Sequence, residues 1–235
     1  MPVEWAGGMK NDFFCIPVHT LGGEMIAIDL RYRPHSVAPG GAVDMVLPGL
    51  SPQERLLNQL LTIEEFADYF RLHGLMCSVA IDFQLARAVT ESSFIQQILT
   101  HLPFVRLKLS EDFPNLHDGM ANPLLRTLIE QLNILWLDDL GAGDANLHAL
   151  QSNMFEAVKL DRQFYVENVD KPFFSVLINH IRQYTNRVIV EGVAGDGQLE
   201  TLNRSKIWGV QGYFVQQLTL ASLEPGDRGQ QCTHR

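Results

Sequence analysis

Cysteine is scarce in this sequence, and no long hydrophobic run occurs. The three cysteines, Cys15, Cys77 and Cys232, are too few and too widely spaced for a disulfide framework, and no two of them lie at metal-ligand spacing. No apolar run approaches the roughly 18–20 residues of a membrane-spanning helix, and the first ten residues lack the basic and apolar regions of a signal peptide. We therefore expect a soluble, cytoplasmic protein that is not exported.

Basic residues are also in short supply. The chain has 18 lysines and arginines against 27 aspartates and glutamates, a formal net charge of −9. Affinity for nucleic acid comes largely from clustered basic side chains against phosphates, so this balance argues against direct nucleic-acid binding. What the chain does have is length and apolar content, with 235 residues of which 46% are hydrophobic. It can bury the core of a full domain.

The apolar residues form eight short runs typical of β-strands. From residue 77 onward these runs alternate with stretches that have the 3.6-residue period of helices, which predicts a parallel sheet covered by helices. Only a turn over 19–24 separates the first two runs, so they should pair antiparallel. We predict an α/β fold, a modified (β/α)8 TIM-like barrel with one antiparallel strand. The predicted strands are 13–18, 25–32, 77–81, 105–109, 134–137, 157–160, 187–190 and 209–214, and the predicted helices are 52–73, 85–102, 123–132, 173–184 and 198–205.

Flanking segments complete the predicted organisation. Residues 1–12 precede the first strand as an N-terminal extension, and the Pro- and Gly-rich stretch 33–51 reads as a loop over one end of the barrel. The polar stretch 224–235 is expected to be a disordered tail. A single domain over 13–223 accounts for the rest.

Acidic residues end most of the predicted strands. The chemistry of such a barrel lies at the C-terminal ends of its strands, and converging carboxylates there can hold divalent cations that activate water against a phosphodiester. The simpler alternative is that each acid is only hydrated at a loop. The acids concerned are Asp29, Glu111, Asp138, Asp139, Asp161 and Glu191.

Four ordered motifs in the second half make the chemistry more specific. They are Asp-Asp-Leu-Gly-Ala-Gly at 138–143, Lys-Leu-Asp at 159–161, Glu-Gly-Val at 191–193 and Gln-Gly-Tyr at 211–213, which begins with Gln211. In these motifs the sequence resembles the EAL domain family, the cyclic di-GMP phosphodiesterases. The resemblance runs from about residue 14 to 223. It implies a modified (β/α)8 barrel with an antiparallel strand, and it makes 13–223 a degenerate EAL domain.

The first half departs from the family pattern at its metal ligands. The Glu-Ala-Leu-x-Arg signature is Asp-Leu-Arg-Tyr-Arg here, so that Asp29 replaces the Glu and Arg31 the Leu, while Arg33 is kept. A shift of one residue would instead put Ile28 at the Glu position. By the same resemblance, Ala80 replaces a metal-binding Asn. In the Glu-x-Thr-Glu strand Lys108 replaces a metal-binding Glu, and Glu111 matches the second Glu.

These changes alter the charge at the matched positions. Asp29, Lys108, Asp138, Asp139 and Glu191 together carry a formal −3, where the family pattern has five carboxylates. An ammonium at 108 would repel a nearby divalent ion by several kcal/mol, even at an effective dielectric of about 20. We hypothesise that the Lys108 ammonium occupies the vacated metal position and pairs with Asp138 or Glu191. The alternative is that Lys108 extends past the strand end into water.

The resemblance implies an inactive member of the family, with a vestigial active site and neither metal nor cofactor. Stand-alone degenerate members of YdiV type bind FlhD and stop the FlhD-FlhC complex from using DNA, so a protein partner of this kind is expected. Two alternatives stay open. One is a receptor that binds cyclic di-GMP without cleaving it, since Arg33, Lys159, Glu191 and Gln211 match family positions around the substrate. The other is an active phosphodiesterase with altered metal usage.

Overall fold

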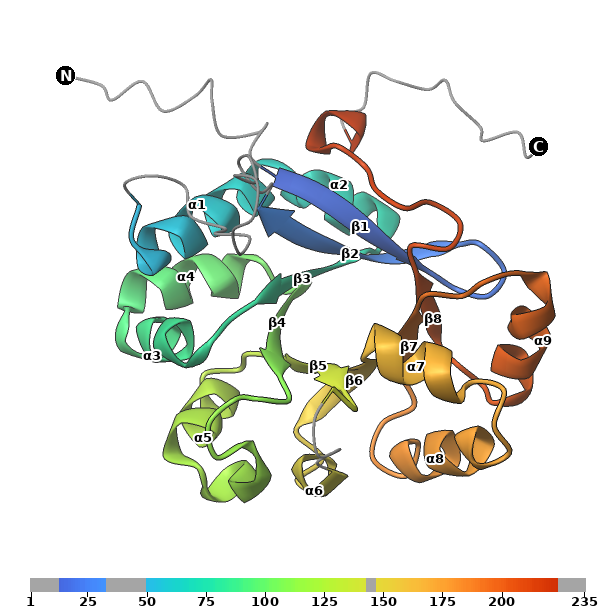
Figure 1. Cartoon of the computed structure of the whole chain (residues 1–235). Coiled ribbons are helices and arrows are strands. Elements are labelled where there is room, and N and C mark those ends of the chain that lie inside the picture. The colour runs from blue at the N-terminus through green and yellow to red at the C-terminus, as the bar shows by residue number, and fades with distance from the viewer. Residues whose placement is uncertain (1–12, 33–49, 143–146, 224–235) are drawn as a thin grey trace, which may run out of the picture.

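A computed structural model describes residues 13–32, 50–142 and 147–223. Within these ranges eight strands close into a barrel in chain order, and helices surround it, as Figure 1 shows. All eight predicted strands are present, and the predicted fold class is confirmed. The strands are β1 Phe13–His19, β2 Met25–Tyr32, β3 Met76–Ala80, β4 Val105–Ser110, β5 Leu135–Leu140, β6 Phe155–Leu160, β7 Val188–Glu191 and β8 Gly209–Gln211.

Strand β1 is the reversed strand of the barrel. It pairs antiparallel with both β2 and β8, while all other neighbours pair parallel. The hairpin follows from the short turn between β1 and β2, because a parallel crossover needs a dozen residues or more. Strand β8 ends at Gln211, three residues earlier than predicted, since Gly212 has a φ of +72° that turns the chain out of the sheet.

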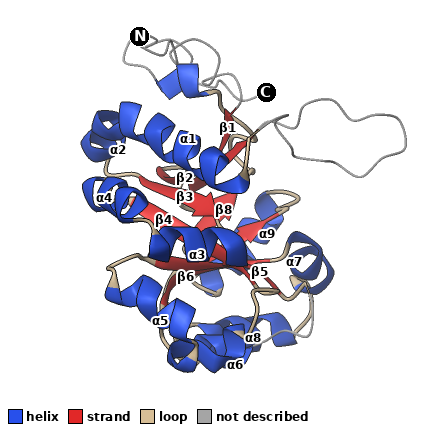
Figure 2. Ribbon diagram, turned by 90° about the vertical axis from the view of Figure 1, so that its left-hand side faces the viewer, coloured by secondary structure: helices blue, strands red, loops and turns tan. Residues whose placement is uncertain are grey.

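The helices cover the outside of the barrel, as the side view in Figure 2 shows. Two helices that the periodicity predicted as continuous are each broken in two. The first bends at Phe66, and the second stops at Ser92, whose φ and ψ of −99° and 107° are extended. The helices are α1 Pro52–Glu65, α2 Ala67–His73, α3 Phe83–Glu91, α4 Ser93–His101, α5 Pro123–Glu130, α6 Leu147–Leu150, α7 Arg162–Asn168, α8 Phe173–Ile181 and α9 Asp196–Arg204, with 3-10 turns η2 Leu116–Ala121 and η3 Leu220–Leu223.

The break at Ser92 has a packing reason. In a continuous helix Ile95 would lie about 240° around the axis from the buried Val89, because each residue turns about 100°. Ending α3 at Glu91 and restarting at Ser93 lets Ile95 face the core together with Ile98. The Ser92 hydroxyl accepts a hydrogen bond from the Ile95 amide, so it caps the new helix.

The barrel interior is layered because side chains alternate along each strand. A lower apolar layer consists of Val18, Ala27, Trp136, Ala157 and Ile189, all nearly inaccessible to water. Two residues further along four of these strands, the same face carries charged groups at the upper, C-terminal end of the barrel. These are Asp29 on β2, Asp138 on β5, Lys159 on β6 and Glu191 on β7. The alternation thus places the apolar layer directly below the candidate site.

A network around Glu156 lies near the lower, N-terminal ends of β4, β5 and β6. The pairing of β5 with β6 is irregular here, since Leu135 pairs with Phe155 but Trp136 with Ala157, leaving Glu156 as an extra residue. Its carboxylate accepts hydrogen bonds from Arg106 at 2.6 Å and from the Trp136 indole at 2.9 Å, and it also pairs with Arg187. Burial alone would raise the pKa of Glu156, but these donors hold it below its usual value.

Across the described ranges, no helix combines the length and the apolar character needed to cross a membrane. The predicted N-terminal extension, the tail and most of the 33–51 loop lie outside the described residues.

We predict that Glu156→Gln lowers the free energy of unfolding at pH 7 by about 1–3 kcal/mol, because two arginines lose their counter-ion. A carboxyl with a depressed pKa contributes stability above its unfolded pKa of about 4.3, and this contribution disappears as the pH falls through the folded pKa. The difference in free energy of unfolding between wild type and variant, measured by urea unfolding, should therefore become smaller from pH 5 to pH 3. Glu200→Gln, at an exposed position on α9, is the control and should change little. An unchanged Glu156→Gln variant would contradict the prediction.

Candidate functional site

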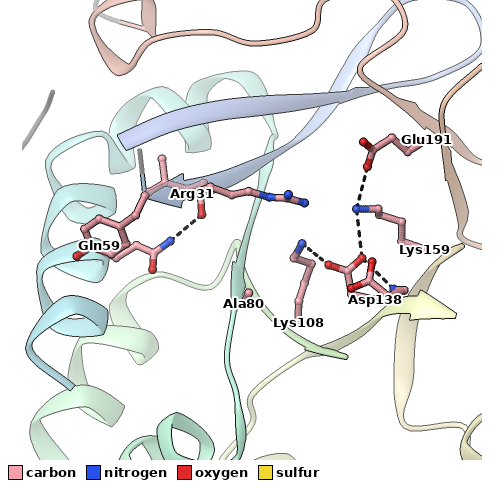
Figure 3. A pocket seen from close by; sticks show the side chains of 10 residues that line it. Arg31, Gln59, Ala80, Lys108, Asp138, Lys159 and Glu191 are labelled. Carbon is pink, nitrogen blue, oxygen red and sulfur yellow. Dashed lines mark hydrogen bonds and ion pairs between the residues drawn. The ribbon is translucent and has the colours of Figure 1, made fainter. Parts of the chain in front are cut away.

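The upper mouth of the barrel holds a cavity of about 370 Å³. Charged side chains from β2, β4, β5, β6 and β7 meet in it, and Figure 3 shows how they point toward one another. This is where the sequence analysis expected the strand-end acids to converge. The lining residues are Leu30, Arg31, Tyr32, Gln59, Ala80, Lys108, Asp138, Asp139, Lys159 and Glu191.

Lys108 lies at the centre of this cluster. Its side chain is only 4% exposed, and its ammonium donates to Asp29 at 2.9 Å and to Asp138 at 2.6 Å. The expected pairing with Asp138 is therefore present, whereas Glu191 pairs with a different lysine. The alternative in which Lys108 extends into water is wrong, since strand β4 directs this side chain into the barrel.

Asp29 is the carboxylate beneath the cluster. It is 1% exposed, and in addition to Lys108 it accepts hydrogen bonds from Arg31 at 2.8 Å and from the Ser78 hydroxyl at 3.1 Å. The Gln211 amide approaches it at 3.4 Å. The neighbouring Ile28 points to the opposite side of the strand and belongs to the main hydrophobic core. Of the two registers left open by the sequence, only the one with Asp29 places a carboxylate against Lys108, directly beneath the cavity.

Lys159 links Asp138 to Glu191. Its ammonium lies 3.3 Å from Asp138 and 3.2 Å from Glu191, so Asp138 is shared between two lysines. Arg31 adds a third cation, with its guanidinium 2.7 Å from Asp29. The three cations match Asp29, Asp138 and Glu191, so that Asp139 is the surplus charge when the described lining residues are counted together with the buried Asp29.

The electrostatics of the cluster are those of a closed ion-pair network. Burial alone would raise the pKa of Asp29, but Lys108 and Arg31 lower it well below its usual value. Burial likewise works against the charge on Lys108, and the two aspartates nevertheless raise its pKa. Asp139 behaves oppositely, because burial and the nearby Asp138 raise its pKa. The lysine and its aspartate partners are therefore all charged at neutral pH.

This arrangement does not fit a divalent metal ion. Magnesium needs carboxylate oxygens at about 2.0–2.1 Å. Both oxygens of Asp138 and Oδ2 of Asp29 already contact ammonium or guanidinium groups, and Oδ1 of Asp29 accepts from the Ser78 hydroxyl. The Ala80 methyl offers no ligand atom. Within the described ranges, no three acidic, histidine or cysteine side chains are grouped to hold a metal. A metal here would face Lys108 across a few ångströms, at a cost of several kcal/mol.

The loop after β5 depends on Glu111. One oxygen of its carboxylate accepts a hydrogen bond from the Gly141 amide at 2.6 Å, so this acid holds a loop. Gly141 has a φ of +102°, and a Cβ on it would lie 2.5 Å from the Phe164 ring. The glycine, which is the first of the two in the 138–143 motif, therefore permits close packing against α7. The second glycine of that motif, Gly143, lies outside the described residues.

Two other predicted site residues differ from expectation. Asp161 accepts a hydrogen bond from the Phe164 amide at 2.7 Å and caps helix α7, which the sequence analysis missed, so it is a helix cap and not a pocket acid. Arg33 lies outside the described residues.

Sequence reasoning also missed two polar residues of the site. Gln59 lies on the buried face of α1 and donates its amide to the Leu30 carbonyl at 2.7 Å, next to the cavity. A polar residue among the leucines of an apolar helix face was the available signal. Ser78 was detectable from alternation, since it precedes Ala80 by two residues on β3.

The chain is similar to known proteins over most of its length. The EAL domain family matches residues 53–217. The cyclic di-GMP phosphodiesterase PdeH of Escherichia coli K12 is 27% identical over 209 residues, covering 85% of this chain and 80% of that protein. The anti-FlhC(2)FlhD(4) factor YdiV of Salmonella typhimurium LT2 is 22% identical over 194 residues, covering 78% and 81%. The crystal structure of the EAL-like domain protein YdiV has a TM-score of 0.75 at 22% identity, covering 90% of this chain and 95% of that chain.

We predict that Lys108→Met lowers the free energy of unfolding at pH 7 by about 3–5 kcal/mol, because Asp29 and Asp138 keep their charge without this partner. The loss should shrink as the pH falls below about 5. Burial raises the pKa of an aspartate, and without Lys108 each of the two carboxyls has one cation fewer to lower it, so those of the variant take up protons at a higher pH than those of the wild type.

Urea unfolding at pH 7 and pH 4.5 measures both effects. Lys206→Met, at an exposed lysine, serves as the control. Equal stability of Lys108→Met and wild type would show that Lys108 is not the counter-ion of the cluster.

Proposed function

This chain belongs to the EAL domain family, and we propose that it is a regulator that acts by binding another protein and does not hydrolyse cyclic di-GMP. The observation that carries the proposal is the Lys108 ammonium held between Asp29 and Asp138. These carboxylates are engaged internally, so they are not available as ligands for the metals on which the family's phosphodiester chemistry depends. The cluster is in this sense a vestigial active site.

Family membership by itself does not decide between enzyme and regulator. The similar proteins include a phosphodiesterase, PdeH, and an anti-FlhC(2)FlhD(4) factor, YdiV. The chemistry of the pocket favours the second kind. We therefore propose the flagellar regulator FlhD-FlhC as the partner, with FlhD as the contacting subunit, which places the protein in the cytoplasm. The net charge of −9 would also suit competition with DNA for a basic partner.

A second candidate function is a receptor that binds cyclic di-GMP without cleaving it. The observation that favours it is the cavity of about 370 Å³, in which Arg31 and Lys159 provide positive charge for phosphates without a metal. Against it, Arg31 replaces an apolar residue of the family signature and is already paired with Asp29.

We predict that cyclic di-GMP stays intact when incubated with micromolar protein and millimolar Mg²⁺ or Mn²⁺, as followed by chromatography. Restoring the family ligands with Asp29→Glu, Ala80→Asn and Lys108→Glu together should bring back Mn²⁺ binding, measured by calorimetry, because Asp138, Asp139 and Glu191 remain. Linear product from the wild type at about 1 turnover per second or more, abolished by Glu191→Ala, would reject the proposal.

We further predict that the tagged protein co-purifies with FlhD-FlhC and prevents the complex from shifting its DNA in a gel. Asp138→Ala and Glu191→Ala should leave this binding intact wherever the variants stay folded, because the pocket is not the binding surface. If FlhD-FlhC does not associate, while cyclic di-GMP binds in calorimetry without metal, the receptor function replaces the proposed one.

A further inference from the structure

A surface groove of about 320 Å³ lies between helices α1, α3 and α4, on the outside of the barrel and separate from the charged pocket. It exists because the helix breaks at Ser92, so that α3 and α4 meet at an angle beside the start of α1. The lining residues are Gln53, Glu54, Leu57, Ala88, Glu91, Ser92, Phe94 and Ile95.

The groove has an apolar floor and an acidic rim. Leu57, Ala88 and Ile95 form its buried or half-buried floor. Glu54 and Glu91 are exposed at its edge, and no lysine or arginine is among the lining residues. Arg87 pairs with Glu91 from one side at 2.8 Å, yet Arg87 itself is not part of the lining. The groove therefore presents apolar surface bordered by negative charge.

Phe94 is the exposed aromatic side chain of this groove. It is 55% exposed, whereas Ile95, Ile98 and Leu99 of the same helix face the core. Core packing thus does not account for an aromatic residue at this position. Exposed apolar surface with a polar rim is typical of interaction sites, and aromatic anchors carry much of the binding energy of interfaces.

We infer that this groove is the docking site for the protein partner, which inserts an apolar side chain flanked by lysine or arginine. The inference rests on the proposed function and adds the surface and the chemistry of the contact. Charge complementarity identifies the occupant, since a basic residue beside the inserted side chain would meet Glu54 or Glu91, and a carboxylate there would be repelled.

The first test compares binding of FlhD-FlhC to wild type, Phe94→Asp and Val176→Asp by biolayer interferometry. Val176 is a matched control, because it is 67% exposed on α8, on another part of the barrel surface. We expect Phe94→Asp to weaken binding at least about 30-fold, and Val176→Asp to leave it unchanged. If wild type binds and Phe94→Asp binds equally well, the docking site is wrong while the proposed function stands.

A second test does not depend on FlhD-FlhC. We use 4-phenylbutylamine and 4-phenylbutyrate as probes, which share an aromatic chain and differ in charge, and follow the backbone amides of Ala88, Glu91 and Ile95 by NMR. The amine should shift the signals of these amides, and the acid should not. In the double variant Glu54→Gln with Glu91→Gln, the ratio of the shift caused by the amine to that caused by the acid should fall at least about threefold. Equal shifts with both probes, or none, would overturn the inference even if FlhD-FlhC fails to bind.

Sedimentation of the same variants identifies a different occupant. If wild type is a dimer and Phe94→Asp is a monomer, the groove is covered by a second copy of this chain, and the inference fails.

Discussion

The ion pairs of Lys108 with Asp29 and Asp138 are the interaction on which the upper half of the barrel depends. A buried ammonium and two buried carboxylates each lose several kcal/mol of hydration. Their mutual contacts at 2.6–2.9 Å compensate for much of this, with further contacts from Arg31 to Asp29 and from Lys159 to Asp138. Each partner thereby holds the others in their charged form. The cluster connects strands β2, β4 and β5, so the geometry of three strand ends is tied to one side chain.

Charge balance then determines what the pocket can do. A cluster of carboxylates alone attracts divalent ions, but one in which Arg31, Lys108 and Lys159 match three acids has little attraction for any cation. Lys108 is in physical terms an internal counter-ion for the acids around it. The barrel thus balances most of the negative charge of its pocket with groups of its own chain.

Much of this could be predicted from the sequence. Alternation and strand-to-helix order were sufficient for the eight strands and the reversed β1, and the motifs brought Asp138, Lys159 and Glu191 together. The sequence patterns did not predict which acid pairs with which lysine. Whether Lys108 meets Glu191 or Asp29 depends on the stagger of strands around the barrel, which periodicity does not encode. Asp161 was misassigned because an acid that ends a strand and an acid that caps the next helix occupy the same place in the sequence.

The apolar layer between the charged pocket and the Glu156 network has a consequence for how such a protein can diverge. The two polar ends are separated by Val18, Ala27, Trp136, Ala157 and Ile189, and no hydrogen bond joins the two networks within the described part of the chain. Substitutions at the upper end can thus change the pocket without destabilising the lower end of the barrel. A barrel built in this way can change the residues of its pocket one at a time and remain folded throughout, while its outer surface stays available for selection toward a different task.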